Sequence, residues 1–272
     1  MAAPHIKEGT ALPELRAIGV LESCFREKFG TPRQPHLVPS SLAKLRIYPQ
    51  YSPLHSLAGL SRFSHVWLIS CFHLNTNKTF HPKIHPPRLK GGKIGVFASR
   101  SPHRPNPLGL SLAKLVRIEG DTLYLSGIDL IDGTPILDVK PYLPFSDAAA
   151  GSTSGWVPDN AFPELAVDFS ARARKDLDAA DPAGEQGLKA LIADILRHDP
   201  RNMRDATQMR DGAELEFFLS DREVHFSVTG NKATVTRVET AGKFEKKPRR
   251  EKPPKNQLLP GSPSTRLSVK AK

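Results

Sequence analysis

Residues 95–115 read GVFASRSPHRPNPLGLSLAKL, a polar loop with three prolines between two apolar runs. The prolines fix the backbone φ angle in a segment that also carries Arg100 and Arg104. Two guanidinium groups presented by a stiff loop are suited to bind carboxylates or phosphates. The stretch therefore predicts a rigid binding loop followed by a β-strand.

Short apolar runs of β type recur on both sides of this loop. Turn-rich pieces separate them, rather than amphipathic helical patterns, which favours an all-β sheet or barrel over alternating strands and helices. Leu110 and Leu112 share one strand face while Leu115 lies on the other, a change of phase that a bulge in a curved strand would produce. The predicted strands are RAIGVLES (16–23), AKLRIY (43–48), HVWLISCF (65–72), KIGVFAS (93–99), LSLAKLVRIEG (110–120) and TLYLSGIDL (122–130).

The composition changes after Phe145, where SDAAAGSTSGWVPD predicts a linker. Beyond it, PELAVDFSARARKDL and EQGLKALIADILRHD have the spacing of amphipathic helices. ELEFFLS, EVHFSVT and ATVTRVE then predict a three-stranded meander. The predicted organisation is a flexible N-terminus (1–14), a β-barrel domain (15–147), a linker (148–158), a small α+β domain (159–239) and a disordered basic tail (240–272).

The formal net charge of +11 is concentrated in residues 241–272, which carry 10 Lys and Arg against 2 Glu. Such a tail is either a solvated arm or a segment that contacts RNA or another acidic surface. Its KKPRREK stretch could also act as a nuclear signal. Two cysteines without a disulfide pattern, and the lack of a long apolar run, predict a cytoplasmic protein with no membrane partner.

Several familiar sites are excluded by their motifs. The chain has no G-x-G-x-x-G after a strand, no G-x-x-x-x-G-K-S/T and no H-E-x-x-H, so neither a Rossmann nor a P-loop nucleotide site is indicated. His65, His73, His81 and His85 have no carboxylate among them. Zinc and iron sites normally combine histidine with Asp, Glu or Cys, and we therefore predict no metal.

Four segments place polar side chains beside apolar strands: TPRQP (31–35), SHVWLISCFHLN (64–75), ASRSPHRPNPLG (98–109) and GIDLIDGTPILDVKPY (127–142). The last contains Asp129, Asp132 and Asp138. Turn formation beside Gly133 explains Asp132. Three carboxylates near a basic loop also suit binding of ribose or ammonium groups, or general-base chemistry.

In this order, PRQP, FSHVW with FH following, GVFASRSPHRPNPLGLSLAKL and DLIDGTPILDVKPYLPF resemble the TrmO family of tRNA N6-adenine methyltransferases. The resemblance covers about residues 15–147, and ILRHDPR extends it more loosely into the second domain. It implies a single-sheet β-barrel, usually homodimeric, that binds S-adenosylmethionine. The implied reaction methylates N6 of threonylcarbamoyladenosine (t6A to m6t6A) next to the anticodon of threonine-type tRNA.

The resemblance also implies a site. Its cofactor contacts fall on Pro32, Arg33, Gln34, His73, Leu74, Arg100, Leu110, Asp129, Leu130, Ile131, Asp132 and Gly133. Arg100 would meet the methionine carboxylate. Leu74 departs from the family pattern, but a backbone contact tolerates this change.

The acceptor nitrogen belongs to a urea-like group, so a carboxylate that removes its proton should help it attack. Asp138 and Asp132 are the candidate bases, and Asp138 could instead pair with Lys140. An anticodon-loop base can be splayed out and stacked by the protein. The candidate tRNA and substrate contacts are Arg104, Asn106, Lys140 and Tyr142, with His103 a further positioning candidate.

Two alternatives stay open for function: a non-catalytic RNA-binding module, or a methyltransferase with another acceptor. The basic residues of the second domain could form a tRNA platform or a solvated helix face. They are Arg172, Arg174, Lys175, Arg197, Arg201 and Arg204.

Overall fold

The structure is a computed structural model that describes residues 14–75, 79–86, 89, 92–157, 164–185, 187–201 and 210–242. Nearly all of the predicted N-terminal segment and basic tail lies outside these residues, as does Arg204. No helix in the described ranges is long and apolar enough to cross a membrane. The five predicted domain boundaries stay predictions.

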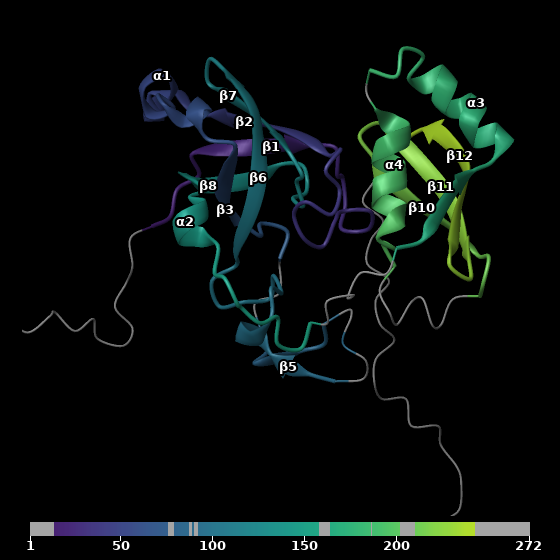
Figure 1. The fold of residues 1–272 in the computed structure, drawn as a ribbon, viewed down its shortest axis with the longest axis horizontal. Helices are drawn as coiled ribbons and strands as arrows, with labels where there is room; N and C mark the ends of the chain where they lie inside the picture. Colours follow the sequence, from purple (N-terminus) through teal and green to yellow (C-terminus); the bar gives the residue numbers. More distant parts are fainter. Residues whose placement is uncertain are drawn as a thin grey trace, which may run out of the picture. The chain divides into compact units, whose positions relative to one another are not determined.

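A closed barrel of six antiparallel strands forms the first half of the chain, as predicted (Figure 1). Inward-facing side chains, among them Leu21, Leu45 and Leu68, are fully buried and fill its interior. Closure leaves this sheet without an exposed edge. Around the barrel the strands are β1 (Gly19–Ser23), β2 (Leu42–Ile47), β7 (Thr122–Ser126), β6 (Leu108–Glu119), β3 (His65–Cys71) and β8 (Thr134–Pro141).

The long strand β6 shows how the barrel curves. Residues 108–114 pair with β3, and from Lys114 onward the strand pairs with β7. The burial of side chains alternates regularly from Leu108 to Leu115, and the register shift lies after Leu115, between Leu115 and Arg117, rather than between Leu112 and Leu115 as predicted. Because a bulge bends and twists its strand, one continuous strand can pass from one neighbour to the next.

The strand predicted at 93–99 is mostly wrong. Only Ile94–Gly95 forms a strand, β5, which pairs with β4 (Lys83–Ile84) outside the barrel. Val96–Ala98 is a 3-10 helix, in which Val96 is buried and Phe97 is 73% exposed. The backbone N–H of Val96 donates to Pro82, so the apolar run caps a loop instead of entering the sheet.

Short helices lie between β2 and β3 and directly after β8. Two are α-helical turns, α1 (Pro53–Ser56) and α2 (Pro144–Asp147). Two are 3-10 helices, Pro49–Tyr51 and Leu60–Arg62.

The second half is a four-stranded sheet with two helices on one face (Figure 1). Side chains of both helices share an apolar core with the sheet, including Leu177, Ile192, Phe217 and Phe226. The strand order is β10 (Glu214–Leu219), β11 (Arg222–Thr229), β12 (Lys232–Thr240) and β9 (Ala166–Phe169), and the helices are α3 (Ala171–Ala180) and α4 (Leu188–Arg197).

Two predictions for this half need correction. The helix predicted over 163–177 begins only at Ala171, and Ala166–Phe169 is strand β9. Ser170 separates the two, because its side chain accepts the Ala173 N–H and caps the helix there. β9 pairs in parallel with β12, so the predicted three-stranded meander has a fourth strand.

Candidate functional site

The loop at 100–107 is held against two other predicted segments by hydrogen bonds. The Arg100 guanidinium donates to the Gln34 side-chain oxygen at 2.5 Å. Phe72 N–H donates to the Pro107 carbonyl at 2.8 Å, and the Asn75 amide donates to the Pro102 carbonyl at 2.9 Å. The PRQP loop, the end of β3 and the proline loop therefore lie together.

Arg104 holds the proline loop in shape. Its Nη1 donates to the Ser99 carbonyl at 2.8 Å and to the Val96 carbonyl at 3.2 Å, and its guanidinium lies 5.5 Å from the Phe97 ring centre. A direct tRNA contact would have to compete with these bonds. The structure therefore gives Arg104 a structural role, while Asn106 on the same loop is exposed.

A hollow of about 300 Å³ lies beside the proline loop. The His103 and Asn75 side chains, which line it, are 3.0 Å apart between Nδ1 and Oδ1. The predicted cofactor contacts His73 and Leu74 form the exposed turn that precedes Asn75. The residues that line the hollow are Asn75, Thr79, Phe80, His103, Arg104, Pro105 and Pro107.

Asp129, in the predicted segment 127–142, lies close enough to Arg100 for the arginine charge to act on it. Its Oδ1 accepts a hydrogen bond of 2.6 Å from the Ser111 hydroxyl on β6. Burial raises the pKa of Asp129 to about 6, and the Ser111 hydrogen bond and the nearby Arg100 charge only partly oppose the rise. A carboxyl with a perturbed pKa beside a cationic loop is typical of a functional site.

Asp132 stabilises a turn. Its Oδ1 accepts the Ser23 N–H at 3.0 Å, and its Oδ2 lies 3.9 Å from Arg26 Nη1. Gly133 has φ +76°, which a residue with a side chain rarely adopts. The Leu130 carbonyl accepts from Ser23, and the Ile131 carbonyl accepts from Thr134. The Leu130–Gly133 segment is therefore a turn that leads into β8, with its Asp132 carboxylate engaged.

Asp138 lies on the outer face of the barrel. It pairs with Ile69 on β3, which in turn pairs with Leu110 on β6. Neighbouring strands are about 4.8 Å apart, so Asp138 and Leu110 lie roughly 10 Å apart on one face. Leu110 is 58% exposed, and Asp138 Oδ2 is 3.1 Å from Lys140 Nζ. The alternative pairing of Asp138 with Lys140 is thus present, and it leaves both side chains accessible.

Tyr142 sits at the far end of the same face. Its N–H donates to the His65 carbonyl at 3.0 Å, and its ring meets the Trp67 ring edge-on with centres 5.9 Å apart. The half-buried Tyr142 ring is therefore fixed by β3 and lies on the side that carries Lys140.

Arg33 points away from the site that the resemblance implied. Its Nη2 donates to the carbonyls of Pro200 and Arg201, at 3.1 and 2.5 Å. Pro32 and Arg33 line a small pocket with residues of α4 and the segment after it. In this structure the PRQP loop contributes Gln34 to the Arg100 cluster, while Arg33 ties the loop to the C-terminal domain.

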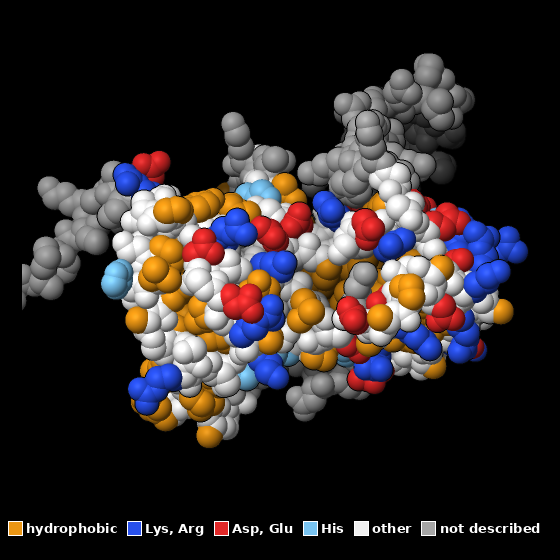
Figure 2. Space-filling model, turned by 90° about the horizontal axis from the view of Figure 1, so that it is seen from above, with side chains coloured by type: hydrophobic (Ala, Val, Ile, Leu, Met, Phe, Trp, Pro, Cys, Tyr) orange, Lys and Arg blue, Asp and Glu red, His pale blue; other side chains and the backbone are white. Residues whose placement is uncertain are grey.

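The basic residues considered as a tRNA platform are mostly ion-paired. Arg174 lies 3.0 Å from Asp168, Arg197 3.1 Å from Asp194 and Arg201 2.8 Å from Asp199. On the face shown in Figure 2, basic and acidic side chains are interspersed rather than separated. This pattern favours a solvated helix face over a dedicated RNA surface.

Two residues of the site were missed by sequence reasoning. Ser111 is 2% exposed and holds Asp129, but a serine in an apolar strand carries no distinctive signal. Trp156 donates its indole N–H to the Ala98 carbonyl at 2.8 Å. A tryptophan inside a glycine- and serine-rich linker was the available sign that this segment contacts another part of the chain, here the Val96–Ala98 helix.

Both halves of the chain resemble known proteins. Residues 20–148 match the model of the tRNA-methyltransferase O N-terminal domain, and residues 163–241 match the TrmO C-terminal domain. The chain belongs to the TrmO family. The resemblance drawn from the four motifs is thereby confirmed, and the second domain is a family domain as well.

Relatives of this TrmO-family chain include a tRNA (adenine(37)-N6)-methyltransferase of Rattus norvegicus, 52% identical over 82% of this chain. The protein of that name from Escherichia coli is 38% identical over 79% of this chain and 93% of its own length. The crystal structure of TrmO from Pseudomonas aeruginosa superposes with a TM-score of 0.70 at 35% identity, covering 84% of this chain and 100% of that one. The chain spans about half the length of the rat relative, at 52%.

Proposed function

We propose that this protein is an S-adenosylmethionine-dependent tRNA (adenine(37)-N6)-methyltransferase. Two relatives that carry this name align over 79% and 82% of the chain. The observation that carries the proposal is the cluster of Arg100, Gln34 and Asp129 at the proline loop. Its donor set suits an amino-acid cofactor, because it offers a guanidinium for a carboxylate and a carboxylate for ammonium or ribose hydroxyls.

The residues of this chain would hold and orient the cofactor, which supplies an electrophilic methyl group when bound. Arg100 would bind the methionine carboxylate, with Gln34 keeping the guanidinium in position through their hydrogen bond. Asp129, held by Ser111, would bind the ammonium or the ribose hydroxyls. The stiff loop limits the motion of Arg100, and fixed geometry of this kind lowers the entropic part of the barrier.

The substrate we propose is threonylcarbamoyladenosine next to the anticodon of threonine-type tRNA. Asp138 is the better placed of the two candidate bases, because the Asp132 carboxylate is engaged in the turn. Asp138 would accept the N6 proton. Lys140, whose Nζ lies 3.1 Å from Asp138 Oδ2, would bind the substrate carboxylate or a loop phosphate. Tyr142 offers an aromatic edge beside the splayed base.

A homodimer is part of the proposal. Leu108 and Leu110, outward-facing residues of β6, are 38% and 58% exposed. A second copy of the barrel would cover such leucines. Sedimentation analysis should show a dimer that becomes a monomer in Leu108→Glu, and a monomeric wild-type chain would contradict this part. A cytoplasmic location stays a prediction.

The deciding experiment is nucleoside mass spectrometry on threonine tRNA, with and without the threonylcarbamoyl group, after incubation with the protein and S-adenosylmethionine. A methyl group gained only on the modified nucleoside supports both reaction and substrate. A methyl group on unmodified adenosine would support the methyltransferase activity and contradict the proposed acceptor. No methylation despite measurable cofactor binding would reject the tRNA activity.

The alternative of a non-catalytic RNA-binding module makes a different prediction. Its RNA affinity would survive Arg100→Ala and fall on removal of residues 241–272, with a strong salt dependence. The methyltransferase proposal expects the wild type to bind the cofactor and Arg100→Ala to weaken that binding by about 10- to 100-fold, with RNA affinity nearly intact. Calorimetry with cofactor and filter binding with tRNA separate the two.

A further inference from the structure

A polar cluster lies on the C-terminal sheet, far in sequence from the methyltransferase motifs. Glu216 on β10 pairs with His225 on β11, which pairs with Arg237 on β12. Paired residues on neighbouring strands share one face of a sheet. Glu223, two residues before His225, lies on that face too, while Val224 and Phe226 point into the apolar core.

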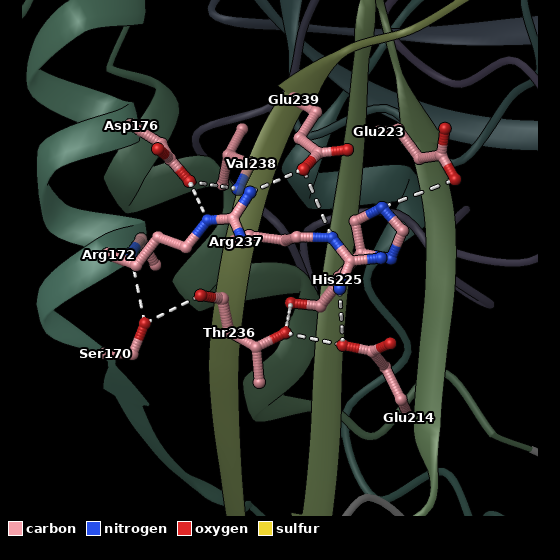
Figure 3. Close-up of polar contacts among 11 residues, drawn as sticks. Ser170, Arg172, Asp176, Glu214, Glu223, His225, Thr236, Arg237, Val238 and Glu239 are labelled. Atoms are coloured by element: carbon pink, nitrogen blue, oxygen red, sulfur yellow. Dashed lines mark hydrogen bonds and ion pairs between the residues drawn. The ribbon is translucent and has the colours of Figure 1, made fainter.

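His225 is buried on this face. The whole residue is 4% exposed, and its Nε2 lies 3.4 Å from Glu223 Oε1. Among the described residues, no group makes a hydrogen bond to this nitrogen. Figure 3 shows the imidazole turned toward the Glu223 carboxylate. A buried ring nitrogen aimed at a carboxylate without a hydrogen bond is costly unless something further satisfies it.

One atom each of Glu216, Glu223 and His225 lies within 4.8 Å of the other two. Metal–ligand bonds of about 2.0–2.2 Å to nitrogen and oxygen bring such atoms somewhat closer, within reach of small side-chain rotations. Glu223 is 24% exposed at its side chain, so a metal ion and a completing water can enter.

Neighbouring charges favour a cation at this point. Arg237 is held by other carboxylates, with Nη1 3.0 Å from Glu214 and Nε 3.3 Å from Glu239 (Figure 3). The strands β10–β12 therefore carry Glu214, Glu216, Glu223 and Glu239 against Arg237, and Arg172 of α3 also reaches Glu239 at 2.8 Å. The local charge is negative although the chain as a whole carries +11.

We propose that Glu216, Glu223 and His225 bind a divalent transition-metal ion, for which Zn²⁺ is the suitable probe. One imidazole and two carboxylates match the ligands that zinc and manganese accept, and they leave a position for water. The ligands come from adjacent strands, so the ion ties β10 to β11. His225 also adjoins a register shift between His225 and Phe226, where the β11–β12 ladder is interrupted. The role is structural, outside the methyl-transfer site.

The test is calorimetric titration of the full chain with Zn²⁺, together with thermal unfolding in the presence and absence of the ion. The expected result is one zinc ion per chain and a melting temperature raised by zinc. Glu223→Gln and Glu216→Gln should each weaken binding by at least about tenfold and remove the stabilisation. Asp168→Asn, a carboxylate of β9 in the same sheet, is the matched control and should bind zinc as the wild type does.

A second measurement avoids the risk that a variant is misfolded. Hydrogen exchange of the wild-type chain should show zinc-dependent protection concentrated in residues 214–229. Equal zinc affinity in the two Gln variants and the wild type, protection confined to other segments, or no zinc binding by the wild type would each overturn the proposal.

Discussion

Arg100 and Gln34 lie 66 positions apart in the sequence and share a 2.5 Å hydrogen bond. The bond joins the proline loop to the PRQP loop, and the charge of Arg100 also acts on Asp129. Three separate segments therefore converge on one guanidinium, which makes Arg100 the first residue to test.

Arg100→Ala should weaken S-adenosylmethionine binding by about 10- to 100-fold, because a hydrogen bond to a charged group contributes about 1.5–3 kcal/mol. Arg100→Lys should recover only part of the loss, since an ammonium cannot reproduce the planar fork. Titration calorimetry measures both. The exposed Arg46, whose Nε lies 4.0 Å from Asp121, is the control, and Arg46→Ala should bind normally. Equal affinity in Arg100→Ala and Arg46→Ala would remove Arg100 from the site.

Asp138→Asn should lower kcat by about 10²- to 10⁴-fold, the contribution expected of a general base, while leaving cofactor affinity unchanged. Asp132→Asn should behave differently, with a kcat close to the wild type and a slightly lower melting temperature, because the amide oxygen can still accept the Ser23 N–H and only the charge facing Arg26 is lost. Single-turnover methylation and thermal unfolding separate the effects. Exposed Asp178 on α3 provides a charge control as Asp178→Asn. A large kcat loss in Asp132→Asn alone would reverse the assignment.

Asp129 should make a recognisable contribution to the pH dependence of stability. Burial raises its pKa to about 6, so between pH 4 and 6 the folded state binds this proton more tightly than the unfolded state. Its contribution to stability is therefore greatest below about pH 4 and falls as pH rises to about 6. Asp129→Asn lacks this loss, so the melting temperature of the variant minus that of the wild type should increase from pH 4 to 7. A difference independent of pH would contradict the raised pKa.

The sequence predicted the barrel because its strands are short, alternate in polarity and pair mostly with strands that are also recognisable. The barrel strand β8 and the strand β9 were both missed, and β9 shows the limit of this reasoning. Ala166–Phe169 is only four residues long and becomes a strand by pairing with Lys232–Val235 of β12, a partner that local periodicity does not reveal. The strand predicted around Val96 was wrong for the opposite reason. Its spacing suits a strand, but no barrel strand pairs with it.

The site could be predicted as a set of segments, but not as a set of contacts. Arg33 and Gln34 are adjacent in a proline-flanked loop, and only the fold shows that one bonds to Arg201, 168 positions away, and the other to Arg100. Likewise the Glu216–His225 pair depends on strand register, because the sequence separates the two by the β10–β11 turn.

Substitution of two barrel glycines, Gly19 and Gly133, should destabilise the protein for different reasons, and asparagine variants distinguish these reasons. A Cβ on Gly19 would lie 2.2 Å from the Arg46 carbonyl oxygen of the neighbouring strand, so any side chain forces the backbones apart. Gly133 has φ +76° and a Cβ added there would meet no atom within 4 Å, so only the backbone conformation restricts it. Asparagine tolerates that left-handed conformation better than alanine does.

Gly133→Ala should therefore cost about 1–2 kcal/mol of unfolding free energy, and Gly133→Asn should restore part of it. Gly19→Ala should cost about 1–3 kcal/mol, as overpacking does, and Gly19→Asn at least as much, because the larger side chain relieves no clash. Urea unfolding of the four variants measures these differences. Recovery of stability in Gly19→Asn would mean that the backbone conformation at β1, rather than the close approach of β2, requires glycine there.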